Sequence, residues 1–183
     1  MTSLSACEST GEEATATSTA DRIANLQERW WQWSAQSSAH SPYTDATGER
    51  CSQRQPDDVW FLIPAPGVDI KRKCTVPAGR AVVGPVLTTT ADDSEACNQY
   101  LAGSAGDVAL DDKSIGVKKL GPEQVSFTSP ADNPLTEESG GISTQACGLW
   151  FTLPPLSPGN HKLIISSRSG TPSFVEYSLT ITR

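Results

Sequence analysis

The sequence contains 183 residues, of which 37% are hydrophobic and 19% are charged, and its net charge is −7. This length suits one domain with its own hydrophobic core, and the 13 prolines and 14 glycines favour a fold with many turns. The acidic balance argues against a nucleic-acid-binding surface, which needs clustered lysine and arginine, and against direct binding to anionic membranes.

The first 20 residues combine a short motif with a polar stretch. Leu4-Ser5-Ala6-Cys7 resembles a bacterial lipobox, in which the cysteine is lipidated and becomes the mature N-terminus. Residues 8–20 hold no large apolar side chain, so we expect a disordered tether. We therefore predict an extracytoplasmic protein that contacts the membrane only through a lipid on Cys7. The few residues before Cys7 do not make a complete signal peptide. If Met1 is the native start, the protein is instead cytoplasmic.

Residues 21–36 are predicted to form an N-terminal helix. Ser18 and Asp21 resemble a capping box at its start. Apolar side chains then recur at the spacing of one helical face. These residues are Ile23, Leu26, Trp30 and Trp33. Trp31 lies off this face.

Beyond residue 58 the hydrophobic period becomes that of β-strands. Residues 59–63 form a continuous apolar run, typical of a central strand buried on both faces. Apolar and polar residues alternate over 70–76, 147–153 and 175–181. Because no βα alternation repeats, we predict an all-β fold. The expected form is an antiparallel immunoglobulin-like or jelly-roll-like sandwich of residues 21–183, with the N-terminal helix packed against it.

The segment between residues 88 and 146 carries weaker patterns. We expect a short helix over 92–101 and strands over 105–112 and 124–128. Residues 129–145, which contain two prolines and a Gly-Gly pair, predict a long surface loop.

Four of the five cysteines lie in the body of the chain and predict two disulfides in an oxidising compartment. Cys51 and Cys74 bracket the apolar run 59–63 and are expected to form one bridge. Cys97 and Cys147 then form the second, although four cysteines permit three pairings. No CxxC pair is present, so a zinc site is disfavoured and we predict neither a metal nor a cofactor.

Tryptophans are the best candidates for a binding surface. Exposed indole rings stack on sugars and other flat apolar ligands, and they are enriched at interfaces. The candidates are Trp30, Trp31, Trp33 and Trp150. In the competing interpretation, Trp30 and Trp33 simply dock the helix on the sandwich, whereas Trp31 and Trp150 are freer to meet a ligand.

No catalytic residue is predicted. The chain has neither a Gly-x-Ser-x-Gly elbow nor a glycine loop that cradles phosphate. His161 is a conceivable general base, but no partner for it is identifiable from the sequence. Asp107, Asp111 and Asp112 offer a weak set of oxygen ligands for calcium, and solvated turns explain them better.

Five stretches carry a family resemblance. They are WWQW at 30–33, DATGERC at 45–51, VWFL at 59–62, CTVPAG at 74–79 and LPPLSPGNH at 153–161. In these stretches the chain resembles a group of uncharacterised bacterial secreted proteins and lipoproteins with a β-sandwich domain. The resemblance implies an exported location and a β-rich fold, and it implies no catalytic residues.

These observations favour a non-catalytic, exported domain at the cell-envelope surface. Its ligand or partner would be a glycan, a small apolar molecule or a protein. One alternative is a small β-rich enzyme, cyclase-like or isomerase-like, that acts on an apolar substrate in a pocket lined by Trp and Tyr. The other alternative is a structural interaction module of the envelope.

Overall fold

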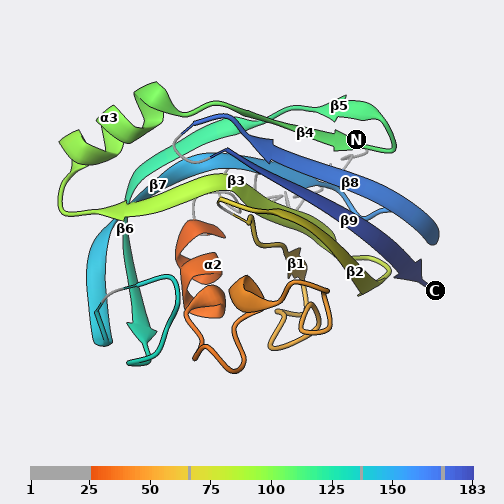
Figure 1. Ribbon diagram of the computed structural model, residues 1–183, viewed down its shortest axis with the longest axis horizontal. Helices are drawn as coiled ribbons and strands as arrows, with labels where there is room; N and C mark the ends of the chain where they lie inside the picture. The colour runs from red at the N-terminus through yellow and green to blue at the C-terminus, as the bar shows by residue number, and fades with distance from the viewer. Residues whose placement is uncertain (1–25, 66, 137, 170–171) are drawn as a thin grey trace, which may run out of the picture.

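The computed structural model describes residues 26–65, 67–136, 138–169 and 172–183. Within them the chain forms two helices, one 3₁₀ turn and nine strands (Figure 1). The helices are α2 (Leu26–Ser34) and α3 (Ser94–Gly103), and the 3₁₀ turn η1 spans Pro42–Thr44. The strands are β1 (Val59–Phe61), β2 (Asp69–Pro77), β3 (Ala81–Ala91), β4 (Gly106–Leu110), β5 (Lys113–Ile115), β6 (Lys118–Ser129), β7 (Gly140–Leu153), β8 (Gly159–Ser167) and β9 (Ser173–Thr182). Neither described helix is long and apolar enough to cross a membrane.

The strands form two mixed sheets, with the orders β1-β3-β7-β6 and β2-β9-β8-β4-β5. Most neighbours are antiparallel, but β1 pairs with β3 in parallel, and so does β2 with β9. The prediction of a β-rich fold is confirmed, whereas the expectation of purely antiparallel sheets is wrong. Parallel neighbours need a long connection, because the chain must return to the same end of the sheet. Between β1 and β3 this connection includes β2, which belongs to the other sheet.

One hydrophobic core lies between the two sheets. β9 shows its origin most clearly, because its residues alternate between buried and more exposed positions as a pleated strand requires. The core-facing residues of β9 are Val175, Tyr177, Leu179 and Ile181. Leu149, Phe151 and Leu153 of β7 meet them from the other sheet.

The apolar run 59–63 is buried on both faces, but β1 lies at the edge of its sheet and not at the centre. Trp60 faces the core between the sheets, and Phe61 faces the helix on the opposite side. The side chain of Gln55 occupies the place of a further strand. Its Nε2 donates to the Phe61 carbonyl and its Oε1 accepts from the Phe61 N–H, each at 2.8 Å. The run therefore predicted burial correctly and sheet position wrongly.

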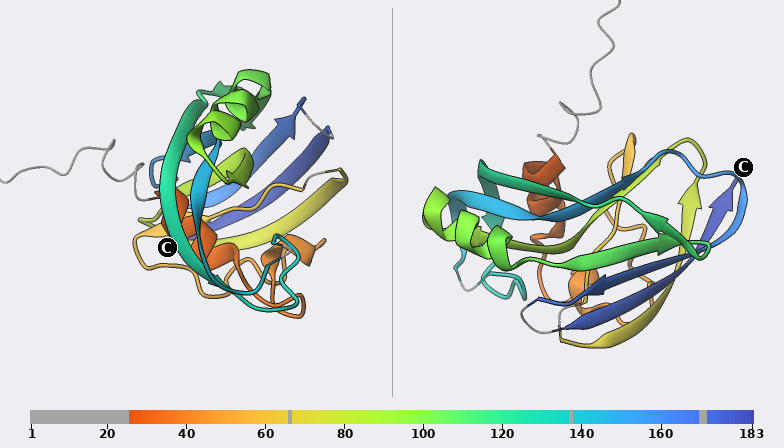
Figure 2. Two further views of the ribbon diagram at one scale, coloured as in Figure 1. Left: turned by 90° about the vertical axis from the view of Figure 1, so that its left-hand side faces the viewer. Right: turned by 90° about the horizontal axis from the view of Figure 1, so that it is seen from above.

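Helix α2 covers part of the outer face of the β1-β3-β7-β6 sheet (Figures 1 and 2). It ends at Ser34, two residues earlier than expected, and residues 21–25 of the expected helix lie outside the described residues. Two of its side chains bind the free edge of β6. Glu28 accepts the Ser126 N–H at 3.0 Å, and Gln32 donates to the Ser126 carbonyl at 3.1 Å.

Helix α3 confirms the helix expected over 92–101, with its start two residues later. The Asp93 carboxylate accepts the Ala96 N–H at 2.8 Å, which satisfies one of the free donors at the helix N-terminus. The Cys97–Cys147 disulfide ties α3 to β7, with the two Cα atoms 5.8 Å apart. α3 therefore lies at one end of the molecule, away from α2 (Figure 1).

The Cys51–Cys74 disulfide joins the segment before β1 to β2, across 5.7 Å between the Cα atoms. Both predicted bridges and their pairing are thus confirmed. Two disulfides are typical of proteins that fold in an oxidising environment.

The strands expected over 105–112 and 124–128 correspond to β4 and β6. The loop expected over 129–145 is shorter, because β7 begins at Gly140 and its first residues pair with the end of β6. The Gly-Gly pair lies within this β-ladder, so it marks a strand start and not a loop.

Candidate functional site

The tryptophans of α2 form a buried aromatic layer on the β1-β3-β7-β6 sheet. Trp30 is 1% exposed, and its Nε1 donates to the Leu62 carbonyl at 2.9 Å. The Nε1 of Trp33 donates to the Gln53 carbonyl at 3.0 Å. The indole N–H groups of Trp30 and Trp33 thus have acceptors, as stable packing favours, whereas that of Trp31 has none among the described residues. Trp30 and Trp33 dock the helix, as the competing interpretation of the sequence proposed.

Trp31 is buried as well, although it lies off the apolar stripe of the helix. Its ring stacks on Phe127 of β6, with the centroids 5.4 Å apart and the planes at 18°. β6 extends far enough along the helix to cover the side that the helical pattern leaves polar. The indole of Trp31 is therefore not available as an exposed stacking surface.

A pocket of about 490 Å³ opens on the same sheet face, beside Trp150. It lies between the start of α2, the first residues of β1, β3 and β6, and the end of β7. Its walls combine apolar side chains with polar groups in similar proportion. The apolar side chains include Leu26, Val59, Val83, Leu120, Trp150 and Pro155. Of the four tryptophan candidates, Trp150 is the one that lines this pocket.

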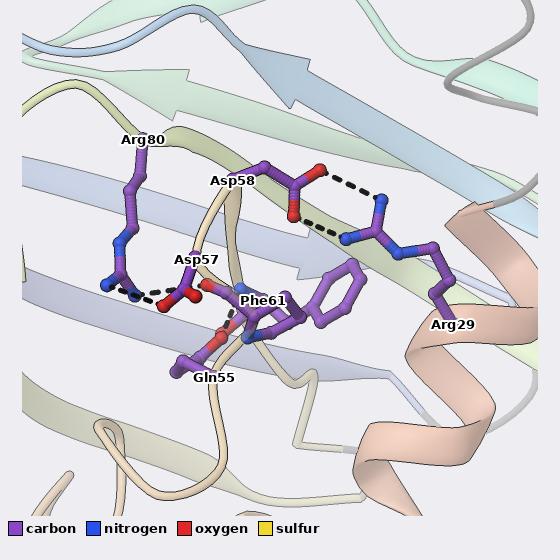
Figure 3. Close-up of polar contacts among 7 residues, drawn as sticks. Arg29, Gln55, Asp57, Asp58, Phe61 and Arg80 are labelled. Carbon is purple, nitrogen blue, oxygen red and sulfur yellow. Dashed lines mark hydrogen bonds and ion pairs between the residues drawn. The ribbon is translucent and has the colours of Figure 1, made fainter.

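Three charged side chains line the pocket, and two of them pair with each other (Figure 3). Arg29 donates to both carboxylate oxygens of Asp58, at 3.1 and 2.5 Å. The guanidinium of Arg29 also lies 5.9 Å from the Phe61 ring centroid. Lys118 is the third, and among the described residues it forms no ion pair. The pocket thus carries one positive charge in excess.

Trp150 lines the pocket but is only 2% exposed, and its N–H is buried. A Cβ atom at Gly148 would lie 2.9 Å from Trp150 Nε1, so the N–H edge lies over this glycine on the same strand. The opposite contact is edge-to-face with Trp30, with the ring centroids 5.8 Å apart. Trp150 Nε1 has no acceptor among the described residues. Trp150 therefore contributes little surface to the pocket, and its polar atom is not part of that surface.

A wider depression of about 910 Å³ lies at the other end of α2. Its lining contains many polar groups, among them Gln32, Gln36, Arg54 and Ser126. This depression is the shallower and more open of the two, so it would enclose less of a ligand. The pocket beside Trp150 is the better candidate for binding.

The acidic residues considered for calcium are engaged in ion pairs. Asp107 pairs with Arg168, and Asp112 pairs with Lys162 at 2.7 Å. Asp111 pairs with His161, as described below. No group of three or more potential metal ligands occurs in the part of the chain that the structure describes.

His161 has an acceptor at each ring nitrogen. Nδ1 lies 2.7 Å from the Asp111 carboxylate, and Nε2 lies 2.9 Å from the Ser157 carbonyl. The Asp111 hydrogen bond and then the Ser157 carbonyl raise the pKa of His161, since both favour the protonated ring. The Lys162 N–H and then His161 lower the pKa of Asp111. Because both nitrogens are engaged, His161 has no free site at which to act as a base.

Arg72 is a buried charge that the sequence analysis did not single out. It is 2% exposed, and it donates to the Asp45 carbonyl at 2.7 Å and to the Ile63 carbonyl at 2.9 Å. It also donates to the Tyr177 hydroxyl at 2.8 Å, which in turn donates to the Ile63 carbonyl. The signal was present, because Arg72 interrupts the apolar side of the 70–76 alternation. This network fixes the segment before β2 to the core and does not reach the pocket.

Glu123 is the half-buried carboxylate nearest α2. Burial raises its pKa, while the hydrogen bond that Gln27 Nε2 donates at 2.8 Å lowers it. The neighbouring charge of Glu28 raises it further. Glu123 lies outside the lining of the pocket, so its protonation does not add a charge there.

Cys7 and its lipobox-like motif lie outside the described residues. No family model matches the chain, and no curated protein matches it. The resemblance to bacterial secreted proteins and lipoproteins therefore stays a prediction.

Two solved structures show weak similarity to the chain. A chain from "Structure of PbICP-C in complex with falcipain-2" is 11% identical, with a TM-score of 0.34, and the match covers 68% of this chain and 99% of that chain. A chain from "Solution Structure of Amebosin" is 9% identical, with a TM-score of 0.27, over 64% of this chain and 100% of that chain. At TM-scores this low, neither likeness carries a conclusion about fold or function.

Proposed function

We propose that this protein is a non-catalytic, extracytoplasmic binding domain whose ligand is a small, largely apolar molecule. The pocket beside Trp150 is the observation that carries this proposal. Its volume of about 490 Å³ falls within the roughly 300–1,000 Å³ typical of small-molecule sites. Such sites combine apolar walls with a few polar groups that orient the ligand, and this pocket has both features.

The location rests on the disulfides and the lipobox-like motif. The bridges Cys51–Cys74 and Cys97–Cys147 favour an oxidising compartment. A lipid on Cys7 would attach the domain to the outer surface of a cell membrane. An immunoglobulin-like sandwich would suit this role, because two sheets with a shared core give a rigid support for a pocket on an outer face.

The sequence left three classes of ligand open: a glycan, a small apolar molecule or a protein. The burial of the tryptophan side chains favours a small apolar molecule over a glycan. All four tryptophan candidates, Trp150 included, are at most 5% exposed, so none presents a face on which a sugar could stack. The pocket's aromatic residue is Trp150, and no tyrosine contributes to its described lining. Arg29 engages Asp58, so the carboxylate at the rim is held by a charge partner.

A pocket-filling substitution tests the proposal. Thr152 lines the pocket and lies directly across from Val83 in the β3–β7 ladder. Thr152→Phe places a ring in the cavity, whereas Thr152→Val changes the chemistry with little change in volume. The probe is the neutral dye N-phenyl-1-naphthylamine, whose fluorescence rises on entering an apolar site. We expect saturable binding by the wild type and the valine variant, and loss of binding by the phenylalanine variant.

Equal dye binding by all three proteins would contradict the assignment of the site. Far-ultraviolet circular dichroism and thermal unfolding of the phenylalanine variant would show whether it remains folded. Should it unfold, Ala81→Leu fills the same pocket from β3 and serves as the second variant. No saturable binding by the wild type would overturn the proposed function itself.

A further inference from the structure

Lys118 is positioned to recognise a charged group on the ligand. It is the first residue of β6 and lies directly across from Trp150 in the β6–β7 ladder. Residues paired across two strands project from the same face of a sheet. Lys119, the next residue, projects from the opposite face of the sheet, where its Nζ donates to the Leu101 carbonyl near the end of α3. Alternation along β6 thus directs one lysine to the pocket and its neighbour to α3.

The charge of Lys118 is not compensated by the rest of the pocket. Arg29 and Asp58 neutralise each other through two hydrogen bonds, so they contribute little net charge. Lys118 is exposed and forms no ion pair within the part of the chain that the structure describes. This excess positive charge stands out in a chain whose net charge is −7. An anion would find its complement at this rim and repulsion over much of the remaining surface.

The apolar walls continue inward from Lys118. Leu120 lines the pocket two residues along β6, and Trp150 lies across from Lys118 on β7. Val83 and Leu26 contribute further apolar surface, both being at most 4% exposed. A ligand that fits this gradient has an apolar body and one acidic end.

We infer that the pocket binds an amphiphile with a single acidic headgroup, the apolar body along the apolar lining of the pocket and the headgroup at Lys118. This inference rests on the proposed function and adds the class of ligand. A carboxylate at Lys118 forms a charge-assisted hydrogen bond, which an alcohol of the same chain length cannot match. A cationic headgroup meets repulsion at the same position.

Isothermal titration with three ligands of equal chain length tests the inference. These are decanoate, decan-1-ol and decylammonium, each used below its micelle concentration with the full-length protein. We expect decanoate to bind about tenfold more tightly than the alcohol, the size of effect that a partly exposed charged hydrogen bond gives. Decylammonium should bind most weakly. The preference for decanoate should decrease as the salt concentration rises, because ions screen an exposed charge.

Lys118→Gln should remove the preference while keeping the affinity for decan-1-ol. Lys113→Gln is the matched control, because Lys113 is an exposed lysine on β5 and does not line the pocket. It changes the net charge equally and should leave the preference intact. Equal affinities for decanoate and decan-1-ol, or an equal effect of both lysine variants, would overturn the inference. In that outcome, dye binding that Thr152→Phe abolishes would still support the proposed function.

Discussion

The outer face of the β1-β3-β7-β6 sheet is closed along one part and open along another. Where α2 lies on it, Trp30, Trp31 and Trp33 form a dry aromatic layer. Beside Trp150 the same face is hollowed into the pocket. Among the described residues, the nine of α2 span about 13 Å and the 14 of β7 about 46 Å, so these helix residues lie over only part of the face.

Within the described residues, the two parts of this face share apolar surface but differ in what lies over it. Val83 contributes to the buried aromatic cluster and also lines the pocket. The closed part uses its apolar surface for stability, and the open part keeps similar surface for a ligand. Changes in the closed part should therefore affect unfolding, and changes in the open part should affect binding.

Trp30→Ala should have the largest effect on stability. Its ring is 1% exposed, contacts Trp31 and Trp150 edge-to-face, and donates to the Leu62 carbonyl. We expect a loss of about 3–5 kcal/mol in the free energy of unfolding, from the lost burial and the cavity that remains. Urea denaturation followed by circular dichroism measures it.

Thr152→Val in the open part is the matched comparison. Its side chain is half-buried and forms no hydrogen bond among those described, so the free energy should change by less than about 1 kcal/mol. Comparable losses from Trp30→Ala and Thr152→Val would show that the two parts of the face do not differ in their role.

Gln55→Ala tests the closure of the β1 edge and should have an intermediate effect. The substitution leaves the N–H and carbonyl of the buried Phe61 without their partners. We expect a loss of about 2 kcal/mol in the free energy of unfolding. The uncovered β1 edge should also make the protein more prone to self-association, which sedimentation velocity would detect.

Gln32→Ala is the control for Gln55→Ala. Gln32 also donates to an edge-strand carbonyl of the same sheet, but its hydrogen bond to Ser126 is exposed. Water replaces an exposed partner, so the loss should stay below about 0.5 kcal/mol. A larger loss for Gln32 than for Gln55 would refute the proposed difference between the edges.

His161→Gln should have the smallest effect, and its size should depend on pH. The pKa of His161 is raised from 6.5, so its contribution is complete below pH 6.5 and is lost as the pH rises through its folded value. The pKa of Asp111 is lowered from 3.8, so its contribution is complete above pH 3.8 and is lost as the pH falls through its folded value. The pair therefore stabilises most between about pH 4 and 6.5.

The difference in Tm between wild type and His161→Gln should thus be largest at pH 5 to 6 and should shrink at pH 9. The Asp111 side chain is 46% exposed, so solvent screens the pair and it contributes under about 1 kcal/mol. The Lys162 backbone N–H and the Lys113 charge also lower the pKa of Asp111. A Tm difference that grows above pH 8 would contradict the assignment of a protonated ring.

Local patterns predicted much of the fold. The alternation over 175–181 gave β9, because a strand with one buried face imposes a period of two on the sequence. The continuous run 59–63 predicted burial correctly but not the position of β1 at the sheet edge. The second sheet covers one face of β1, α2 covers the other, and Gln55 bonds its free edge, so the strand is buried as a central strand would be. The burial of Trp31 was missed because Phe127, which covers it, lies far along the chain.

The pocket was beyond local patterns. Asp58, Lys118 and Trp150 come from separate elements, and only the strand order and register bring them together. Trp150 was a candidate because its neighbours Leu149 and Phe151 face the core, which directs it to the other side of β7. The sequence did not single out Lys118 as a site residue, because its role in the pocket depends on its pairing with Trp150 of β7.

Heteronuclear NMR of the tryptophan indoles tests the central claim most directly. The five indole N–H groups give separate resonances that single Trp→Phe variants assign. On titration of the full-length protein with decanoate, we predict that the Trp150 resonance shifts and saturates at one equivalent. The Trp33 resonance should stay in place, since its N–H is bound to Gln53 at the other end of α2. A Trp150 resonance that does not move, or one that moves no more than that of Trp33, would contradict the account.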